Sequence, residues 1–218
     1  MKKQIALALS IVLIALTLIW LFKNRTQDEL LKVMPVPEFE LINQEGEIIT
    51  NEDMLGQVYV VEFFFRNCPT ICPIMNANLQ KVMYEINDDN FSVIGISIDP
   101  KRDSVEALKA YKNQLKIENP NWHFTTKDRD YIFNLSEKFK IYVEEDYSNS
   151  GGLEHSGKVA LVDKNGIIRS RFNEIGMPIL YYSALNYETP DGKIADLKGE
   201  FSPEIDWLIE DIKILLKD

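Results

Sequence analysis

Cysteine and histidine are scarce in this chain of 218 residues, which contains only two of each. Two cysteines cannot build the disulfide framework that small secreted domains use in place of a large core. Cys68 and Cys72 are separated by only three residues. A disulfide between them would close so short a loop that chain entropy would contribute only about 2 kcal/mol. A pair this local is better explained by redox or metal chemistry than by stabilisation of the fold.

Basic residues are also in deficit, because 24 Lys and Arg stand against 34 Asp and Glu, a net charge of −10. Four of the basic residues, Lys2, Lys3, Lys23 and Arg25, lie in the first 25 positions, where no acidic residue occurs. The remaining chain therefore carries 20 basic against 34 acidic residues, a net charge of −14. An acidic domain repels a phosphate backbone, so we expect no nucleic-acid partner.

Charged residues are absent from positions 5–22, an apolar run with Trp20 near its end. At about 1.5 Å per residue this run approaches the roughly 30 Å of a bilayer core, and tryptophan suits the interface. A cleaved signal peptide is the alternative, although no small-x-small cleavage site is evident. We expect residues 1–25 to form a single-pass membrane anchor, 26–37 a linker, and 38–218 one domain on the extracytoplasmic side.

The order of patterns after the anchor predicts an α/β domain with a thioredoxin-like fold and an N-terminal β-hairpin. Near-continuous apolar runs at 57–65 and 91–99 are typical of strands buried on both faces of a sheet. A β-α-β unit followed by a β-hairpin and a final helix is the thioredoxin arrangement. The expected elements are a hairpin over 38–50, a strand over 57–65, a helix within 68–87, a strand over 91–99, a helix over 105–115, a short strand over 122–126, a helix over 128–140, a hairpin around 164–166 and a helix from 202.

Residues 174–202 do not fit this pattern, since they contain two prolines and Asp191-Gly192 without a clear periodicity. Loops of this length inside a compact domain are usually functional or mobile. We treat the segment as an insertion without an assigned role.

Cys68 and Cys72 lie where the 57–65 strand meets the following helix. If Cys68 stands at the helix entrance and Cys72 in the first turn, both sulfurs can converge, because positions i and i+4 share a face. The positive end of the helix dipole stabilises a thiolate, which predicts lowered cysteine pKa values. A dithiol can exchange electrons with another disulfide, although that chemistry usually uses two intervening residues. A metal ion would require a third ligand.

The third ligand would have to be His123 or His155. His155 follows a stretch of Ser, Asn and Gly and precedes an apolar run, which in a thioredoxin-like fold places it near the loop facing the start of the first helix. His123 lies among aromatic residues and is better explained as a packed or surface histidine. Two thiolates and one imidazole form a soft, low-coordination set that suits Cu(I). Zinc is not excluded by ligand type, although a structural zinc site needs a fourth protein ligand.

Three segments, in order along the chain, resemble the Sco/SenC family. They are FFFRNCPTICPIMNANLQKV, GISIDPKRDSVEALKAY and EHSGKVALVDKNGIIRSRF. The resemblance implies a thioredoxin-like domain that binds copper, as Cu(I) or Cu(II), and helps deliver it to the binuclear copper centre of cytochrome c oxidase. Some members of the family are thought to reduce the cysteines of that target instead.

The resemblance also implies Cys68, Cys72 and His155 as the copper ligands and Asp99 as an acidic group beside the site. The implied partner is the copper-bearing subunit of cytochrome c oxidase, or another exported protein with cysteines. A membrane-anchored thiol–disulfide oxidoreductase that uses Cys68 and Cys72 as catalytic residues is the alternative, and a peroxidase fits the spacing poorly. Residues 174–202 are a departure that could alter the choice of partner.

Overall fold

The computed structural model describes residues 17, 30–141, 143–144, 153–173, 176–185 and 204–218, with only the backbone at positions 144, 154 and 155. The chain divides into two units, Met1–Leu31 and Lys32–Asp218, and the second holds nearly all of the described residues. Within the described part, no helix has both the length and the apolar character needed to span a bilayer. The predicted anchor at 5–22 lies outside that part, Thr17 excepted, so it stays a prediction.

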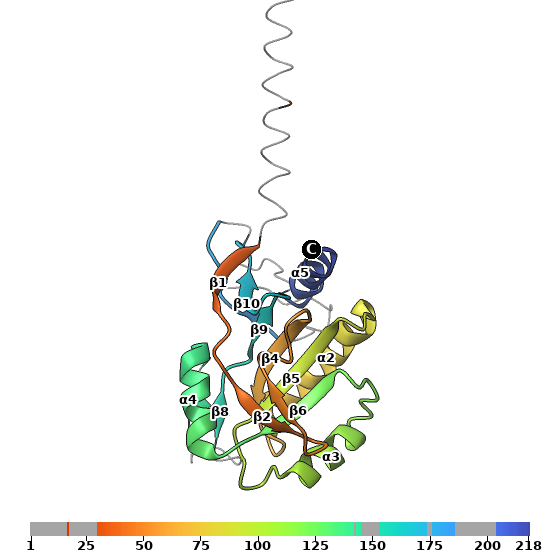
Figure 1. Cartoon of the computed structure of the whole chain (residues 1–218), viewed down its shortest axis with the longest axis vertical. Coiled ribbons are helices and arrows are strands. Elements are labelled where there is room, and N and C mark those ends of the chain that lie inside the picture. Colours follow the sequence, from red (N-terminus) through yellow and green to blue (C-terminus); the bar gives the residue numbers. More distant parts are fainter. Residues whose placement is uncertain (1–16, 18–29, 142, 145–152, 174–175, 186–203) are drawn as a thin grey trace, which may run out of the picture. The chain divides into compact units, whose positions relative to one another are not determined.

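The described strands and helices follow the expected alternation along the chain (Figure 1). The strands are β1 (Leu31–Pro35), β2 (Glu40–Asn43), β3 (Ile48–Thr50), β4 (Val58–Phe64), β5 (Phe91–Ser97), β6 (Trp122–Thr126), β7 (Val143–Glu144), β8 (Glu154–His155), β9 (Lys158–Val162), β10 (Ile167–Ser170) and β11 (Tyr182–Ser183). The helices are α2 (Ile71–Ile86), α3 (Val105–Gln114), α4 (Arg129–Phe139) and α5 (Glu204–Lys217).

One large mixed sheet forms the core, with the strand order β1-β10-β9-β4-β5-β6-β2-β3, and β11 pairs with β9. The strands β4, β5 and β6 run parallel, while β9 runs antiparallel to β4. Every residue of β4 and β5 is buried, as expected for strands covered on both faces. The parallel β4-α2-β5 unit joined to the β9–β10 hairpin and α5 is the predicted thioredoxin arrangement, so this part of the prediction is confirmed.

Helices cover both faces of the sheet. Successive side chains of β4 point to opposite faces, so neighbouring residues of this strand contact different helices. Phe63 meets Phe139 of α4 edge-on, with ring centroids 5.8 Å apart. Phe64 stacks on Tyr111 of α3 with centroids 5.9 Å apart, and Asn76 of α2 donates a hydrogen bond to the Tyr111 hydroxyl. Helix α4 therefore lies on one face and α2 and α3 on the other.

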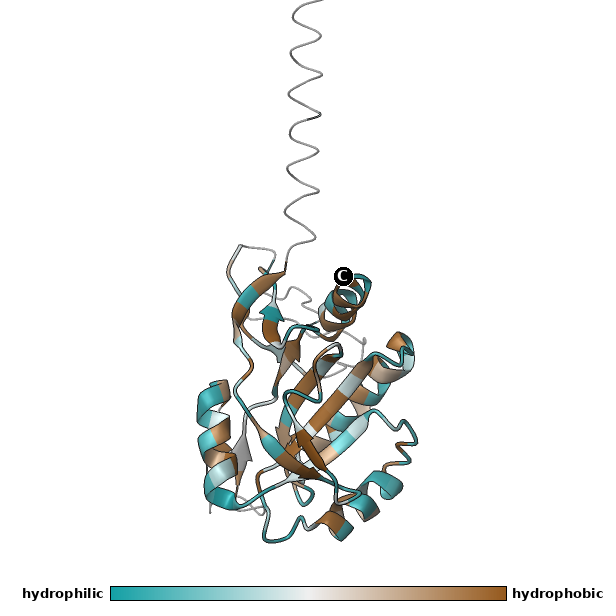
Figure 2. Cartoon of the chain, in the orientation of Figure 1, coloured by the Kyte–Doolittle hydropathy of each residue, from teal (hydrophilic) through white to brown (hydrophobic). Residues whose placement is uncertain are grey.

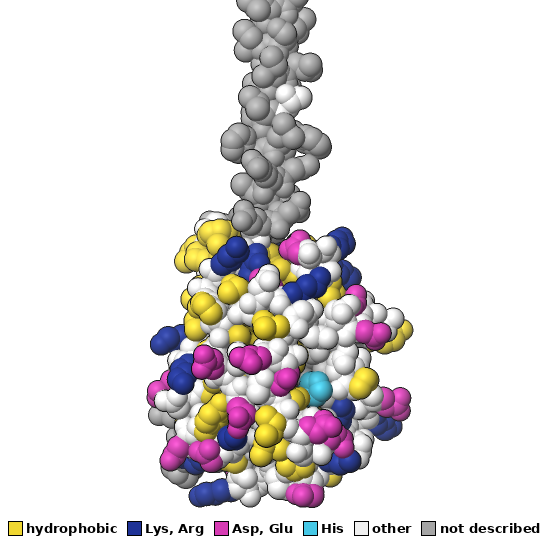
Figure 3. Space-filling model, viewed as in Figure 1, with side chains coloured by type: hydrophobic (Ala, Val, Ile, Leu, Met, Phe, Trp, Pro, Cys, Tyr) yellow, Lys and Arg dark blue, Asp and Glu magenta, His cyan; other side chains and the backbone are white. Residues whose placement is uncertain are grey.

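Side-chain chemistry follows these layers. Hydrophobic residues line the central strands, and hydrophilic residues predominate on the outer helices (Figure 2). Acidic and basic side chains are interspersed over the face seen in Figure 3. That face therefore carries no large field of one sign, despite the net charge of the chain.

A buried carboxylate attaches the C-terminal helix to the sheet. Asp211 of α5 is fully buried and accepts hydrogen bonds from the Arg171 guanidinium and the Tyr182 hydroxyl. Arg171 follows β10 and Tyr182 belongs to β11, so one side chain joins α5 to two segments of the sheet. This network also explains how an aspartate can be buried, because its charge is paired.

Four strands were not predicted. The strand β1 lies within the expected linker 26–37 and pairs with β10, and β11 lies within the expected insertion 174–202 and pairs with β9. The strands β7 and β8 pair with each other in a separate two-stranded sheet. Short strands of this kind depend on partners distant in sequence, which a local pattern does not reveal. Of the segment 174–202, only residues 176–185 are described.

Candidate metal centre

The cysteine pair occupies the connection between β4 and α2. The Cys68 N–H donates a 3.1 Å hydrogen bond to the Phe65 carbonyl, which closes a tight turn directly after the strand. Because α2 begins at Ile71, Cys68 precedes the helix and Cys72 lies in its first turn. The two side chains are only 8% and 1% exposed, and no disulfide joins them.

The two thiols nevertheless meet, as the spacing predicted. The Cys68 and Cys72 side chains form a hydrogen bond with each other, and the Phe65 N–H donates to the Cys72 sulfur. The Cys68 sulfur also lies 3.7 Å from the Thr70 hydroxyl oxygen. The turn before the helix, rather than a shared helical face, brings the sulfurs together.

The predicted lowering of the cysteine pKa is wrong for Cys72. Its pKa is raised, first by the hydrogen bond with the Cys68 thiol and then by burial, while the Phe65 N–H opposes both effects. The negative charges of Cys68 and Glu62 raise it further. Burial and a second thiol therefore outweigh the helix terminus, and in the metal-free dithiol Cys72 favours the protonated form.

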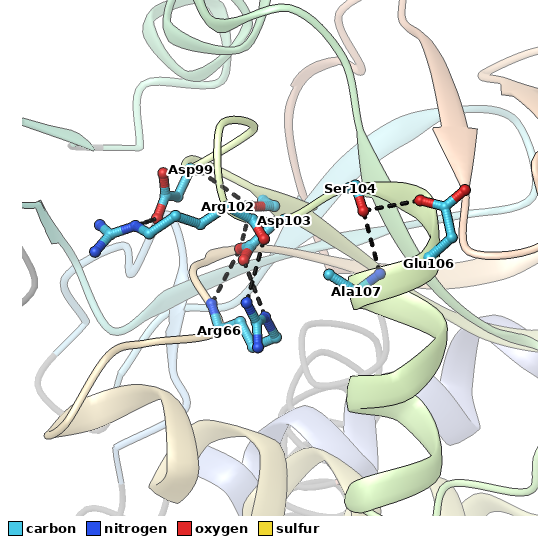
Figure 4. Close-up of polar contacts among 8 residues, drawn as sticks. Arg66, Asp99, Arg102, Asp103, Ser104, Glu106 and Ala107 are labelled. Carbon is cyan, nitrogen blue, oxygen red and sulfur yellow. Dashed lines mark hydrogen bonds and ion pairs between the residues drawn. The ribbon is translucent and has the colours of Figure 1, made fainter.

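The connection between β5 and α3 lies against the cysteine turn (Figure 4). Asp99, predicted to lie beside the site, is nearly buried, and its carboxylate pairs with the Arg102 guanidinium. Asp103, four residues later, contacts the turn directly, because it accepts hydrogen bonds from the Arg66 N–H and the Arg66 guanidinium. No described contact joins Asp99 to either cysteine, so its role stays a prediction.

A third buried carboxyl, that of Glu62, lies near Cys72. Glu62 of β4 is fully buried, and neither of its carboxyl oxygens has a hydrogen-bond partner among the described residues. Burial raises its pKa to about 8. Its partner across the sheet is Gly95 of β5, where an added Cβ would stand 3.3 Å from a Glu62 carboxyl oxygen. The missing side chain at Gly95 thus leaves room for the carboxyl group.

The structure places only the backbone of His155, which pairs with Val143 in the β7–β8 ribbon. Its side chain lies outside the described residues, so the convergence of its imidazole on the sulfurs stays a prediction. Among the described side chains, no group of three or more His, Cys, Asp and Glu could hold a metal ion. That search could not include the imidazole of His155.

His123, predicted to be a packed or surface histidine, lies in β6 and is partly buried. Its Nδ1 atom is buried without a hydrogen-bond partner among the described residues. Burial and the nearby Lys112 lower its pKa. His123 lines a cavity of about 690 Å³ whose lining includes neither cysteine.

Sequence reasoning missed Glu62, Arg66 and Asp103. A signal existed for Glu62, since it is the only charged residue in the apolar run 57–65. No comparable signal marked Asp103, because its contact with Arg66 joins residues 37 positions apart.

Comparisons with known proteins agree with this fold. The family model described as SCO1/SenC matches residues 28–186. An SCO2-like protein of Rickettsia prowazekii is 31% identical over 140 residues, which cover 62% of this chain and 67% of the relative. The match to the SCO2-like proteins of Rickettsia conorii and Rickettsia typhi covers 64% of each relative, slightly less than two thirds.

Two solved structures share the fold. A SCO1/SenC family lipoprotein from Bacillus anthracis superposes with a TM-score of 0.66 at 26% identity, covering 86% of this chain and 97% of the lipoprotein. Bradyrhizobium japonicum ScoI, solved with copper bound, gives a TM-score of 0.60 at 18% identity, covering 84% of this chain and all of ScoI. With a family match over most of the described domain and a dithiol at the end of β4, the chain belongs to the SCO1/SenC family.

Proposed function

We propose that this protein binds one copper ion through Cys68, Cys72 and His155 and delivers it to the binuclear copper centre of cytochrome c oxidase during assembly. The observation that carries the proposal is the contact between two buried thiols at the end of β4. Family membership supports it, as does the copper found in the similarly folded ScoI.

The donor set suits this cargo. Thiolate sulfur prefers Cu(I), and a pair of adjacent sulfurs needs little rearrangement to hold one ion. Each thiol must lose its proton to become a ligand, so binding of Cu(I) by the pair releases two protons. The protein contributes by burying both sulfurs and by fixing the turn that carries Cys68. An imidazole from β8 would complete a three-coordinate site.

We also propose that residues 1–25 anchor the protein in a membrane, with the domain on the extracytoplasmic side. The uncharged run at 5–22 and the flanking Lys2 and Lys3 support this location. Anchoring would hold the domain near partners embedded in the same membrane.

Anaerobic copper titration of the full-length chain, followed by absorption spectra, tests the site. Wild-type protein should bind one copper ion, and Cys72→Ser should lose tight binding. His155→Ala should bind at least tenfold more weakly, because one coordinating bond is lost. The matched control is His123→Ala, which should bind like wild type. Unchanged stoichiometry and affinity in either Cys72→Ser or His155→Ala would refute the proposed site.

A thiol–disulfide oxidoreductase is the second candidate, since the contact that would hold a metal also allows the two sulfurs to close a disulfide. In that reaction Cys68 and Cys72 would lose two electrons and two protons to a disulfide of an exported protein, which becomes a dithiol. His155→Ala separates the candidates. A reductase keeps its exchange rate with an oxidised peptide in that variant, whereas a copper chaperone loses copper transfer.

A further inference from the structure

Asp103 is a fully buried carboxylate that joins the ends of two neighbouring parallel strands. One oxygen accepts hydrogen bonds from the Arg66 N–H at 3.1 Å and the Ser97 hydroxyl at 2.6 Å. The other oxygen accepts from Nε of Arg66 at 3.3 Å. Arg66 follows β4 and Ser97 ends β5, and Figure 4 shows the Arg66 side chain directed at the carboxylate.

The Arg66 end of this contact belongs to the cysteine turn. Arg66 is an internal residue of the turn that the bond from the Cys68 N–H to the Phe65 carbonyl closes. The Phe65 N–H in turn donates to the Cys72 sulfur. A shift of Arg66 would therefore move the Phe65 donor and the Cys68 thiol together.

The other end of the contact is held independently of the cysteines. The Asp103 N–H donates a 2.9 Å hydrogen bond to the Asp99 carbonyl, and the Asp99 N–H donates to the Ser97 hydroxyl. Ser104 then caps α3 by accepting a hydrogen bond from the Ala107 N–H. Asp103 thus belongs to a hydrogen-bonded turn between β5 and α3. The position of this turn does not depend on the cysteines, so Asp103 can hold the cysteine turn in place.

We propose that Asp103 is the positioning residue of the dithiol, holding the turn with Cys68 against the end of β5 so that the sulfurs of Cys68 and Cys72 stay adjacent. The use of this arrangement for copper rests on the proposed function. The effect of Asp103 on the positions of the two sulfurs does not depend on that function.

The carboxylate matters more than the arginine side chain in this arrangement. The Arg66 side chain is 32% exposed, so water competes for its guanidinium, whereas the backbone N–H bond to Asp103 survives any substitution except proline. Hydrogen bonds to a charged acceptor are stronger than those to a neutral one. Asp103→Asn therefore weakens the anchor, while Arg66→Gln leaves its main bond in place.

The test measures the dithiol–disulfide equilibrium of the full-length, metal-free protein in glutathione buffers. Holding two thiols in place raises their effective concentration and favours their disulfide. Asp103→Asn should lower the equilibrium constant for disulfide formation about tenfold, which corresponds to a midpoint potential about 30 mV higher. Arg66→Gln should change the constant less than threefold.

Ser104→Ala is the matched control, because it removes a helix cap from the next residue without touching Arg66. It should lower the melting temperature while leaving the equilibrium constant at the wild-type value. A wild-type constant in Asp103→Asn, or an equal change in Ser104→Ala, would overturn the proposal. If Asp103→Asn does not fold, Ser97→Ala removes one partner of the same carboxylate, and a smaller change in the same direction is expected.

A copper titration of the same variants separates this proposal from the proposed function. If wild-type protein binds copper, Asp103→Asn should bind it about tenfold more weakly, with altered thiolate-to-Cu(II) absorption bands, and Ser104→Ala should match wild type. If wild-type protein binds no copper, the proposed function fails, and the glutathione measurement still decides the role of Asp103.

Discussion

Replacement of Glu62 by glutamine should make the protein more stable than wild type as the pH rises. The Glu62 carboxyl is fully buried without a hydrogen-bond partner among the described residues, and its pKa is raised to about 8. A glutamine has nearly the same shape but cannot ionise. Comparison of the two proteins therefore isolates the cost of keeping a proton on the buried acid.

The sign and size follow from the proton balance. Below about pH 4.5, the ordinary value, Glu62 is protonated in both the folded and the unfolded chain. Above that pH only the unfolded chain releases the proton, so the free energy of unfolding falls by about 1.4 kcal/mol per pH unit. The loss stops near pH 8, where the folded protein also ionises, and totals roughly 5 kcal/mol, of which about 3 kcal/mol is reached by pH 7.

Urea denaturation at closely spaced values between pH 4 and pH 9 measures this difference. The free energy of unfolding of Glu62→Gln minus that of wild type should rise through this range and level off near pH 8. The exposed Glu52 supplies the control, since Glu52→Gln should give a difference that changes by less than about 0.5 kcal/mol over the same range. A Glu62→Gln curve parallel to the wild-type curve would show that the pKa of Glu62 is the same in the folded and the unfolded chain, which would contradict the burial argument.

Three further predictions, the first with a control variant, can be checked by thermal and urea unfolding. Asp211→Asn should cost about 3 kcal/mol, because the partly buried Arg171 loses its buried counter-ion. Glu210→Gln, which removes the exposed counter-ion of the same arginine, should cost less than about 1 kcal/mol. Equal losses would contradict the burial argument. Gly95→Ala should cost about 1–3 kcal/mol, since its Cβ would stand 3.0 Å from a ring carbon of Phe124. A neutral effect would mean that the neighbouring rings move aside without cost. Asp128→Ala should cost about 1 kcal/mol by removing the cap of α4, and no loss would show that this helix end is already frayed.

The main elements were predictable because their patterns are local. The run over 57–65 became β4, and the Lys164-Asn165-Gly166 turn joins β9 to β10. The helix expected over 105–115 is α3, which Ser104 caps. In each case the deciding signal is periodicity or turn chemistry within a few residues.

The geometry of the site was only partly predictable, because it depends on contacts across the sheet. The convergence of Cys68 and Cys72 followed from their spacing, but the direction of the Cys72 pKa shift did not, since it depends on burial and on Phe65. The anchoring of the cysteine turn by Asp103 joins residues from two different strand ends. Such contacts come from the parallel register of β4 and β5, which no local pattern specifies.

The pairing of β1 with β10 has a practical consequence for preparing a truncated, secretable fragment. A fragment that begins at the predicted domain boundary, residue 38, would lack β1 and leave one side of β10 unpaired. Unpaired edge strands of this kind promote aggregation. It would also discard Leu30, whose side chain is buried, and the Val36 N–H, which donates to the Gly166 carbonyl at 2.8 Å. An expressed fragment should therefore start at residue 29 or earlier, so that β1 stays paired with β10.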